Sequence, residues 1–317
     1  MRLVAALALL GMAPAIGADF VERDLTVGQG EWAVSGTLTM PGKGKGPWPA
    51  AVLIHGSGPH DRDSTVGATK PFRDLAHGLA AKGVAVLRYD KRTYQHQGRL
   101  AAATEMTPKE EVFDDAAAAV DLLRKMPEVN GDRVFVIGHS MGATLAPRMA
   151  PLIPKLGGIV MLAASARPIA DVVVEQIAYL RTQPENQSAE AQAKIAEIEQ
   201  AAAKLKAIRE DDAGFILGAP VSYWRWWGQY DPLGEAAKLE LPVLILQGER
   251  DYQVTMTDFE LWKKRLGGKA NVTLKSYEDL NHLFVTGKGR SKPAEYMVGG
   301  KVAVKAVEEI AAWIRAR

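Results

Sequence analysis

The centre of the chain reads RVFVIGHSMGATLAPRM over residues 133–149. The apolar run that ends at Ile137 predicts a buried strand, and the Ala-rich run after Gly142 predicts a helix. Between them lies a G-x-S-x-G sequence, which in this context predicts a sharp turn that presents Ser140. Glycines on either side let strand and helix approach closely, and the helix directs its positive end toward negative charge developing at the turn. Ser140 is therefore a candidate nucleophile; the alternative is an inert serine in a glycine-rich turn.

Further strands and helices alternate on both sides of this stretch. Two runs, 20–27 and 33–40, alternate apolar and polar residues as an antiparallel pair would. Mostly continuous apolar runs, typical of strands buried on both faces, occupy residues 50–55, 84–89, 133–137, 158–163, 242–247 and 272–277. Helical patterns fall between most of them, at residues 71–82, 109–125, 143–153, 258–266 and 301–315. This alternation predicts an α/β fold with a mostly parallel, doubly wound sheet.

Residues 167–238 interrupt the alternation with no convincing strand. Helical patterns cover residues 169–182 and 189–209, and an aromatic cluster follows at Tyr223–Tyr230. We interpret this stretch as a helical cap inserted over the carboxyl edge of the sheet, where open α/β sheets bind ligands. The remaining core then comprises residues 19–166 and 239–317.

The N-terminus has the layout of a secretory signal peptide. Arg2 supplies a positive charge, residues 3–16 are apolar, and small residues follow at Gly17 and Ala18. The apolar run is shorter than the roughly 20 residues that span a membrane. We expect residues 1–18 to be removed by cleavage near Ala18, giving a periplasmic or secreted protein without stable membrane insertion; an uncleaved anchor is the alternative.

Composition excludes several classes of function. The 317 residues carry 39 Lys and Arg against 37 Asp and Glu, a net charge of +2, so no broad basic surface for nucleic acid is expected. The chain has no cysteine, which excludes disulfides, thiol catalysis and Cys-ligated zinc or iron–sulfur clusters. Neither of the charged runs, 61–63 and 90–92, is accompanied by the further ligands that a metal site needs, so no metal is expected.

A nucleophilic serine needs a base, and His282 is the best placed of the six histidines. It follows the last expected strand, in a loop that returns to the edge where Ser140 is exposed. Asp251 follows strand 242–247 and is the expected partner that orients the imidazole. Glu249 is its nearest rival, and Asp279 is more consistent with a turn or cap.

Two backbone N–H groups are expected to form an oxyanion hole. One belongs to Met141, directly after the candidate nucleophile. The other belongs to Ser57 in the loop after strand 50–55, with Gly58 as the alternative.

The remaining motifs carry weaker signals. Trp224 and Trp227 are candidate substrate contacts because aromatic walls bury apolar groups well, although packing of the cap would explain them equally. The runs 61–63 and 90–92 are rich in charge and are interpreted as salt-linked loops rather than substrate contacts.

Several stretches resemble the α/β-hydrolase superfamily, and more narrowly exported bacterial serine esterases of the dienelactone-hydrolase-like and serine-aminopeptidase-like group. They read HGSGPHDRD at 55–63, RYDKR at 88–92, GHSMG at 138–142 and LNHLF at 280–284. The resemblance implies an α/β-hydrolase fold with an inserted helical cap, no cofactor, and hydrolysis of small-molecule esters with small to medium acyl chains. An aminopeptidase-like or acylpeptidase-like amide hydrolase is the alternative, and a non-catalytic binding protein on the same scaffold is a third.

Overall fold

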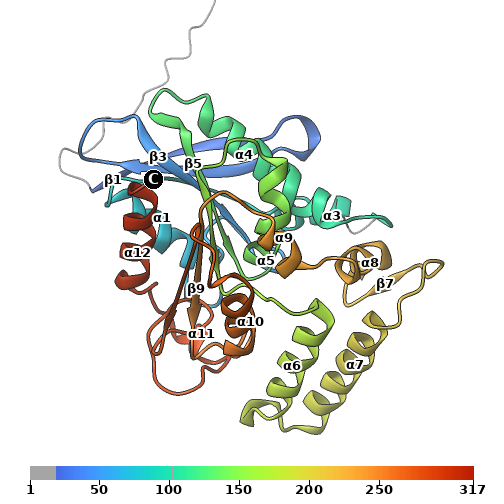
Figure 1. Cartoon of the computed structure of the whole chain (residues 1–317). Helices are drawn as coiled ribbons and strands as arrows, with labels where there is room; N and C mark the ends of the chain where they lie inside the picture. Colours follow the sequence, from blue (N-terminus) through green and yellow to red (C-terminus); the bar gives the residue numbers. More distant parts are fainter. Residues whose placement is uncertain (1–18, 101–102) are drawn as a thin grey trace, which may run out of the picture.

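An eight-stranded sheet forms the centre of the computed structural model, which describes residues 19–100 and 103–317 (Figure 1). The strands run in the order β1-β2-β4-β3-β5-β6-β9-β10. Their bounds are β1 (Phe20–Val27), β2 (Val34–Pro41), β3 (Trp48–Ile54), β4 (Ala85–Tyr89), β5 (Val129–His139), β6 (Gly158–Leu162), β9 (Val243–Gly248) and β10 (Val272–Tyr277). β2 pairs antiparallel with β1 and β4, and all other neighbours are parallel. The expected sheet and its opening antiparallel pair are confirmed. The expected signal peptide, residues 1–18, lies outside the described residues.

Helices cover both faces of the sheet (Figure 1). Outside residues 167–238 they are α1 (Pro71–Ala80), α2 (Arg92–Gln95), α3 (Gln97–Leu100), α4 (Asp114–Arg124), α5 (Met141–Met149), α10 (Met256–Leu266), α11 (Glu295–Val298) and α12 (Val304–Arg315). Alternate side chains of β3 divide between two cores: Val52 and Ile54 join that of α4, α5 and α10, whereas Ala51 and Leu53 join that of α1 and α12. Burial on both faces explains the continuous apolar runs in the sequence.

The segment 167–238 lies between β6 and β9. It contains α6 (Ile169–Arg181), α7 (Ala189–Leu205), β7 (Phe215–Ile216), β8 (Ala219–Pro220), α8 (Val221–Gly228) and α9 (Pro232–Ala237). α6 and α7 share a small apolar core of Ile177, Ile195 and Ala202 and project as a pair from the body of the molecule (Figure 1). At its start the segment is held by the buried Asp258 of α10, whose Oδ1 accepts the N–H groups of Ala166 at 2.9 Å and Arg167 at 3.1 Å.

One feature of this segment differs from the sequence-based expectation. β7 and β8 form a small antiparallel hairpin where no strand is expected. Its two central residues, Leu217 and Gly218, have φ of 48° and 79°. Positive φ at both positions is the type I′ geometry of two-residue hairpins, which usually carries Asn or Asp where this chain has Leu217. Because leucine is atypical at this position, the sequence does not predict the turn.

Candidate active site

Ser140 lies on the turn between β5 and α5, at the carboxyl edge of the sheet. Its backbone angles, φ 54° and ψ −119°, are outside the regions that non-glycine residues ordinarily occupy. A Cβ at Gly138 would lie 2.4 Å from the carbonyl oxygen of Gly142, and one at Gly142 would lie 2.5 Å from those of Ile54 and His55. The glycines therefore make room for a strained serine, and such strain clusters at functional sites.

His282 and Asp251 meet at the same edge of the sheet. They come from the loops after β10 and β9, and both are buried. Nδ1 of His282 lies 2.6 Å from Oδ2 of Asp251. Oδ1 of the same carboxylate accepts the N–H groups of Gln253 at 2.7 Å and Val254 at 3.1 Å. A carboxylate held in this way keeps the proton of the neutral imidazole on Nδ1, so that Nε2 can accept another.

The rival carboxylates lie elsewhere. Oε1 of Glu249 accepts the hydroxyl of Ser276 at 2.7 Å. Asp279 forms an ion pair with Lys305 on α12. Of the three acidic residues considered from the sequence, the structure brings only Asp251 to the imidazole of His282.

The other candidate bases also have partners of their own. Ring nitrogens contact the carbonyl of Tyr89 (His55), the carbonyl of Ser57 (His60), the carboxylate of Glu22 (His77) and the carbonyl of Ala33 (His96).

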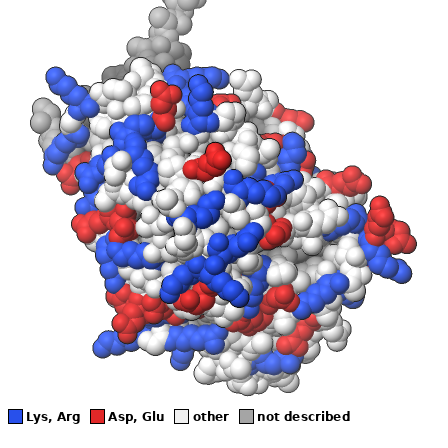
Figure 2. Space-filling model, in the orientation of Figure 1, with Lys and Arg blue, Asp and Glu red and all other residues white. Residues whose placement is uncertain are grey.

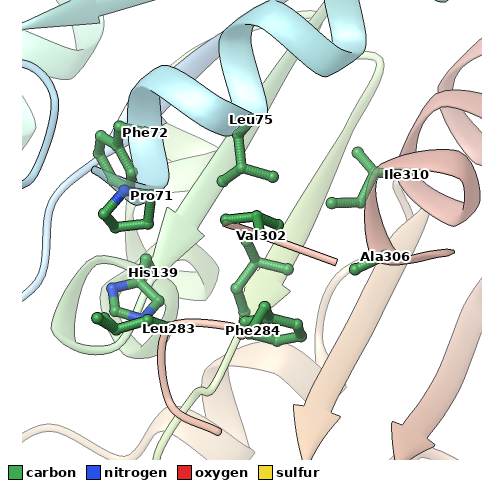
Figure 3. A pocket seen from close by; sticks show the side chains of 10 residues that line it. Pro71, Phe72, Leu75, His139, Leu283, Phe284, Val302, Ala306 and Ile310 are labelled. Atoms are coloured by element: carbon green, nitrogen blue, oxygen red, sulfur yellow. The ribbon is translucent and has the colours of Figure 1, made fainter. Parts of the chain in front are cut away.

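His139 joins the serine turn to the loop that carries His282. Its Nε2 lies 2.8 Å from the carbonyl oxygen of His282, and the two rings are 4.7 Å apart. Figure 3 shows its imidazole beside Pro71 and Leu283 in a small apolar cavity. Burial, and after it the neighbouring His282, lower the pKa of His139 to about 3. The ring is therefore neutral at physiological pH and donates its proton from Nε2 to the carbonyl of the base.

Asn281 shapes the loop around His282. Its side-chain oxygen accepts the N–H groups of Leu283 and Val285, both at 3.0 Å. Sequence reasoning missed this residue, although an asparagine beside the base is a recognisable turn former. The bonds hold the backbone that positions the imidazole.

Met141 and Ser57, the expected oxyanion donors, line one cavity together with Gly58. Met141 opens α5, where an N–H has no partner within the helix. A Cβ at Gly56 would lie 3.1 Å from Cβ and 3.6 Å from Oγ of Ser140. The loop at residues 56–58 therefore lies against the serine.

That cavity has a volume of about 700 Å³ and lies between the core and the segment 167–238. Trp224 and Trp227, the expected substrate contacts, line it, as do Ile169 and Val173 of α6. Its size is that of pockets for drug-sized molecules, and its walls are largely apolar. Tyr223 lines the cavity as well. Trp226 and Tyr230 stack on each other instead, and the Tyr230 hydroxyl donates to the carbonyl of Thr144 at 2.7 Å.

The charged runs are mostly salt-linked, as the sequence indicates. Arg62 lies 2.8 Å from Asp90, and Arg92 lies 2.5 Å from Asp115. Lys91 differs because its ammonium pairs with Glu111 and in addition donates to the carbonyls of Gly56 and Gly58, in the loop after β3. Sequence reasoning did not assign it a place beside the oxyanion donors.

Charge and metal-ligating groups are dispersed. Figure 2 shows basic and acidic side chains interspersed over the visible face. Within residues 19–100 and 103–317, no cluster of three His, Cys, Asp or Glu could hold a metal ion. Across the same ranges, every helix is too short or too polar to cross a membrane.

Comparison with known proteins identifies a family of hydrolases and several esterases that this chain resembles. The family described as serine aminopeptidase, S33 matches residues 50–288. Esterase EstD of Thermotoga maritima is 42% identical over 296 residues, which cover 93% of this chain and 68% of that protein. Est1E from Butyrivibrio proteoclasticus has a similar structure, with a TM-score of 0.59, 18% identity and coverage of 93% and 99%. The Pyrococcus furiosus esterase Pf2001 gives a TM-score of 0.56 with 17% identity, covering 89% of this chain and 90% of its own.

Proposed function

The chain belongs to the serine aminopeptidase S33 family of α/β-hydrolases, and we propose that it cleaves carboxylic esters through Ser140, His282 and Asp251. The observation that carries the proposal is the buried bond of 2.6 Å between His282 and Asp251 at the sheet edge that holds the strained Ser140. The identity of 42% with Esterase EstD supports an ester rather than another acyl substrate.

The proposed reaction has two halves. His282 takes the hydroxyl proton of Ser140 while the oxygen attacks the ester carbonyl, and the N–H groups of Met141 and Ser57 stabilise the resulting oxyanion. The C–O bond to the alcohol then breaks as His282 returns the proton to the leaving oxygen. Water adds to the acyl-enzyme by the same route, so that the acid is released and Ser140 regains its proton.

The cavity supports small to medium acyl chains. Its volume of about 700 Å³ and the walls formed by Trp224, Trp227 and Ile169 would bury an apolar group next to the oxyanion loop. In this proposal the segment 167–238 is a cap that supplies one wall of the acyl pocket. Trp224 and Trp227 are then substrate contacts as well as packing residues.

An aminopeptidase would require an acidic anchor for the substrate amine. Glu175 and Glu185 of the segment 167–238 are the candidates for such an anchor, and neither fits this role well. Glu175 lies 2.5 Å from Arg167, and Glu185 lies on the turn after α6, away from the residues that line the cavity. Glu111 lines the cavity but pairs with Lys91 at 2.6 Å. These contacts favour an ester substrate over an amine-bearing peptide.

We further propose that the protein acts in the periplasm or outside the cell, on the layout of residues 1–18. Mass spectrometry of the protein exported by a bacterial host tests this, since cleavage near Ala18 would leave a chain that begins close to Asp19. Retention of Met1–Ala18 on a cytoplasmic product would contradict it.

The central experiment compares Ser140→Ala with Ser276→Ala, a control on the edge strand β10 whose hydroxyl donates to Glu249. We expect Ser140→Ala to lower hydrolysis of p-nitrophenyl esters by roughly 10⁵-fold or more with an unchanged unfolding midpoint, and the control to keep wild-type activity. A fluorophosphonate should label the wild type and not Ser140→Ala. Ester hydrolysis that persists in Ser140→Ala would refute the nucleophile. Faster cleavage of aminoacyl anilides than of esters would favour the peptidase, and a wild type inert to all three reagents would favour a binding protein.

A further inference from the structure

We propose that Lys91 is a positioning residue that turns the N–H of Ser57 toward the reacting oxygen. The inference rests on the proposed function, because it assigns a purpose to a contact next to the proposed oxyanion hole. Lys91 follows β4 and is one of the largest fully buried side chains. No part of the proposed acid–base chemistry uses it.

The Lys91 ammonium has three close oxygen partners. Nζ lies 2.9 Å from the carbonyl oxygen of Gly56, 3.0 Å from that of Gly58 and 2.6 Å from Oε1 of Glu111. An ammonium has no further donor to offer. Two of these contacts are hydrogen bonds that hold the loop at residues 56–58, and the third is an ion pair.

The geometry of the peptide between Gly56 and Ser57 determines where the Ser57 N–H points. In a trans peptide, the C=O and the following N–H point to opposite sides of the chain. Because the Gly56 carbonyl is aimed at Lys91, the Ser57 N–H must point away from Lys91. Within the described part of the chain, that N–H donates to no backbone carbonyl.

The second bond fixes the loop without competing for the oxyanion. The carbonyl of Gly58 is joined to Pro59, which has no N–H, so this peptide supplies no donor. Gly58 itself has φ of 92°, in the region that favours glycine. Without the bonds from Lys91 to the carbonyls of Gly56 and Gly58, a loop with two glycines could hold the Ser57 N–H in many orientations.

Glu111 supplies the negative charge that balances the buried ammonium of Lys91. Glu111 is buried, lies in the π-helical turn η2 (Lys109–Phe113) and also lines the cavity. Buried ion pairs contribute little stability compared with apolar residues of similar volume. Stability alone therefore gives a weak reason for this pair, whereas an ammonium is well suited to hold two carbonyls at once. π-helical turns are themselves frequent at functional sites.

The test uses Lys91→Met, Glu111→Gln and the double variant, with Lys70→Met as the control. Lys70 pairs with Asp63 at 3.0 Å and does not touch the loop at residues 56–58. For p-nitrophenyl acetate we expect Lys91→Met to lower kcat roughly 100-fold, comparable to the loss of one oxyanion donor, with KM within about threefold. Lys70→Met should keep the wild-type kcat.

The double variant separates positioning from folding. Lys91→Met alone leaves the Glu111 carboxylate buried without its partner, which destabilises the fold. Lys91→Met with Glu111→Gln removes that charge, so the urea midpoint should recover toward wild type while kcat stays low. Recovery of kcat together with the midpoint, or a rise in KM at constant kcat, would show that Lys91 is only structural and overturn the proposal.

Fluorophosphonate labelling of Ser140 provides a second readout. Its rate also depends on the oxyanion donors, so it should fall in Lys91→Met and in the double variant but not in Lys70→Met. If the wild type is labelled but prefers amides, the esterase proposal fails while the Lys91 comparison stands. Equal labelling of all variants would overturn the role of Lys91.

Discussion

At the residue scale, each part of the site depends on a neighbour that fixes its direction. Asp251 fixes the ring of His282, and the N–H groups of Gln253 and Val254 fix Asp251 in turn. Ser140 is fixed differently, by a strained backbone that only close packing at glycine can hold. These supports can be removed one at a time.

Asp251→Asn keeps the shape of the acid and removes its charge. The amide can donate to Nδ1 of His282, which would put the imidazole proton on the wrong nitrogen, so we expect kcat to fall roughly 10³- to 10⁴-fold with little change in KM. Steady-state kinetics with p-nitrophenyl acetate measure this. Glu249→Gln is the matched control, because Glu249 is close in sequence and bonds Ser276 instead. A larger loss in Glu249→Gln than in Asp251→Asn would reverse the assignment.

Gly142→Ala tests the space behind the serine turn. The added methyl group would lie 2.5 Å from two carbonyl oxygens of the β3 end, so the turn must shift. We expect a loss of about 1–3 kcal/mol in the free energy of unfolding and a fall of at least about 100-fold in kcat. Urea unfolding and ester kinetics check the two effects. Gly268→Ala is the control, since a Cβ there meets nothing within 4 Å. Wild-type kcat in Gly142→Ala would mean that the turn tolerates the shift.

At the scale of elements, the proposed active site combines the ends of core strands with the segment 167–238. β5, β9 and β10 deliver Ser140, Asp251 and His282 to a common edge. α6, α8 and the β7–β8 hairpin complete the cavity from the other side. The core thus positions the chemistry, and the segment 167–238 is where we expect substrate preference to reside.

Trp224→Leu and Trp226→Leu test this division at two positions of α8 that lie on different faces of the helix. Trp224 lines the cavity, whereas Trp226 stacks on Tyr230 at 5.1 Å and packs edge-on to Phe113. Widening the wall at Trp224 should raise the ratio of kcat/KM for octanoate over acetate esters about tenfold, because pocket volume discriminates chain length by factors of this size. Trp226→Leu should change that ratio by less than about twofold while lowering stability. Equal shifts in both variants would place the acyl chain elsewhere.

The sequence predicts the elements better than the contacts between them. Six of the eight core strands follow from continuous apolar runs, and β1 and β2 follow from alternation of apolar and polar residues. The β7–β8 hairpin does not, since Leu217 adopts positive φ without the usual turn residue. Lys91 and Asn281 were missed for another reason. Their roles depend on backbone groups that only the fold brings near, and Lys91 reaches carbonyls 35 and 33 positions away.

At the scale of the whole molecule, buried neutral histidines link folding to pH. Burial lowers the pKa of His139 to about 3 and that of His55 well below its usual range. His139 contacts the carbonyl of His282, and His55 directly follows β3, next to the loop at residues 56–58. Both rings therefore lie beside the proposed site. In the unfolded chain the same rings titrate near 6.5.

These shifts predict a loss of stability in mild acid. Between pH 6.5 and the folded pKa of His139, about 3, the unfolded state binds more protons than the folded state. Stability is therefore fully present above pH 6.5 and falls with decreasing pH, by up to about 1.4 kcal/mol per pH unit for each such histidine. Urea unfolding at pH 7 and pH 5 measures this. For His139→Gln, whose amide can still donate to the His282 carbonyl, the difference between the two pH values should shrink by about 2 kcal/mol.

Ile310→Val controls for a general loss of stability, because it trims the cavity that His139 shares and keeps the imidazole. It should lower the free energy of unfolding by about 1 kcal/mol at both pH values.

If His139→Gln and Ile310→Val show the same pH dependence as the wild type, His139 is protonated in the folded protein at pH 5. The bond from its Nε2 to the His282 carbonyl would survive that protonation, but the added charge beside the imidazole of His282 would oppose the base becoming positively charged. Acid sensitivity would then appear in kcat instead of in unfolding, so the two measurements together locate where the proton binds.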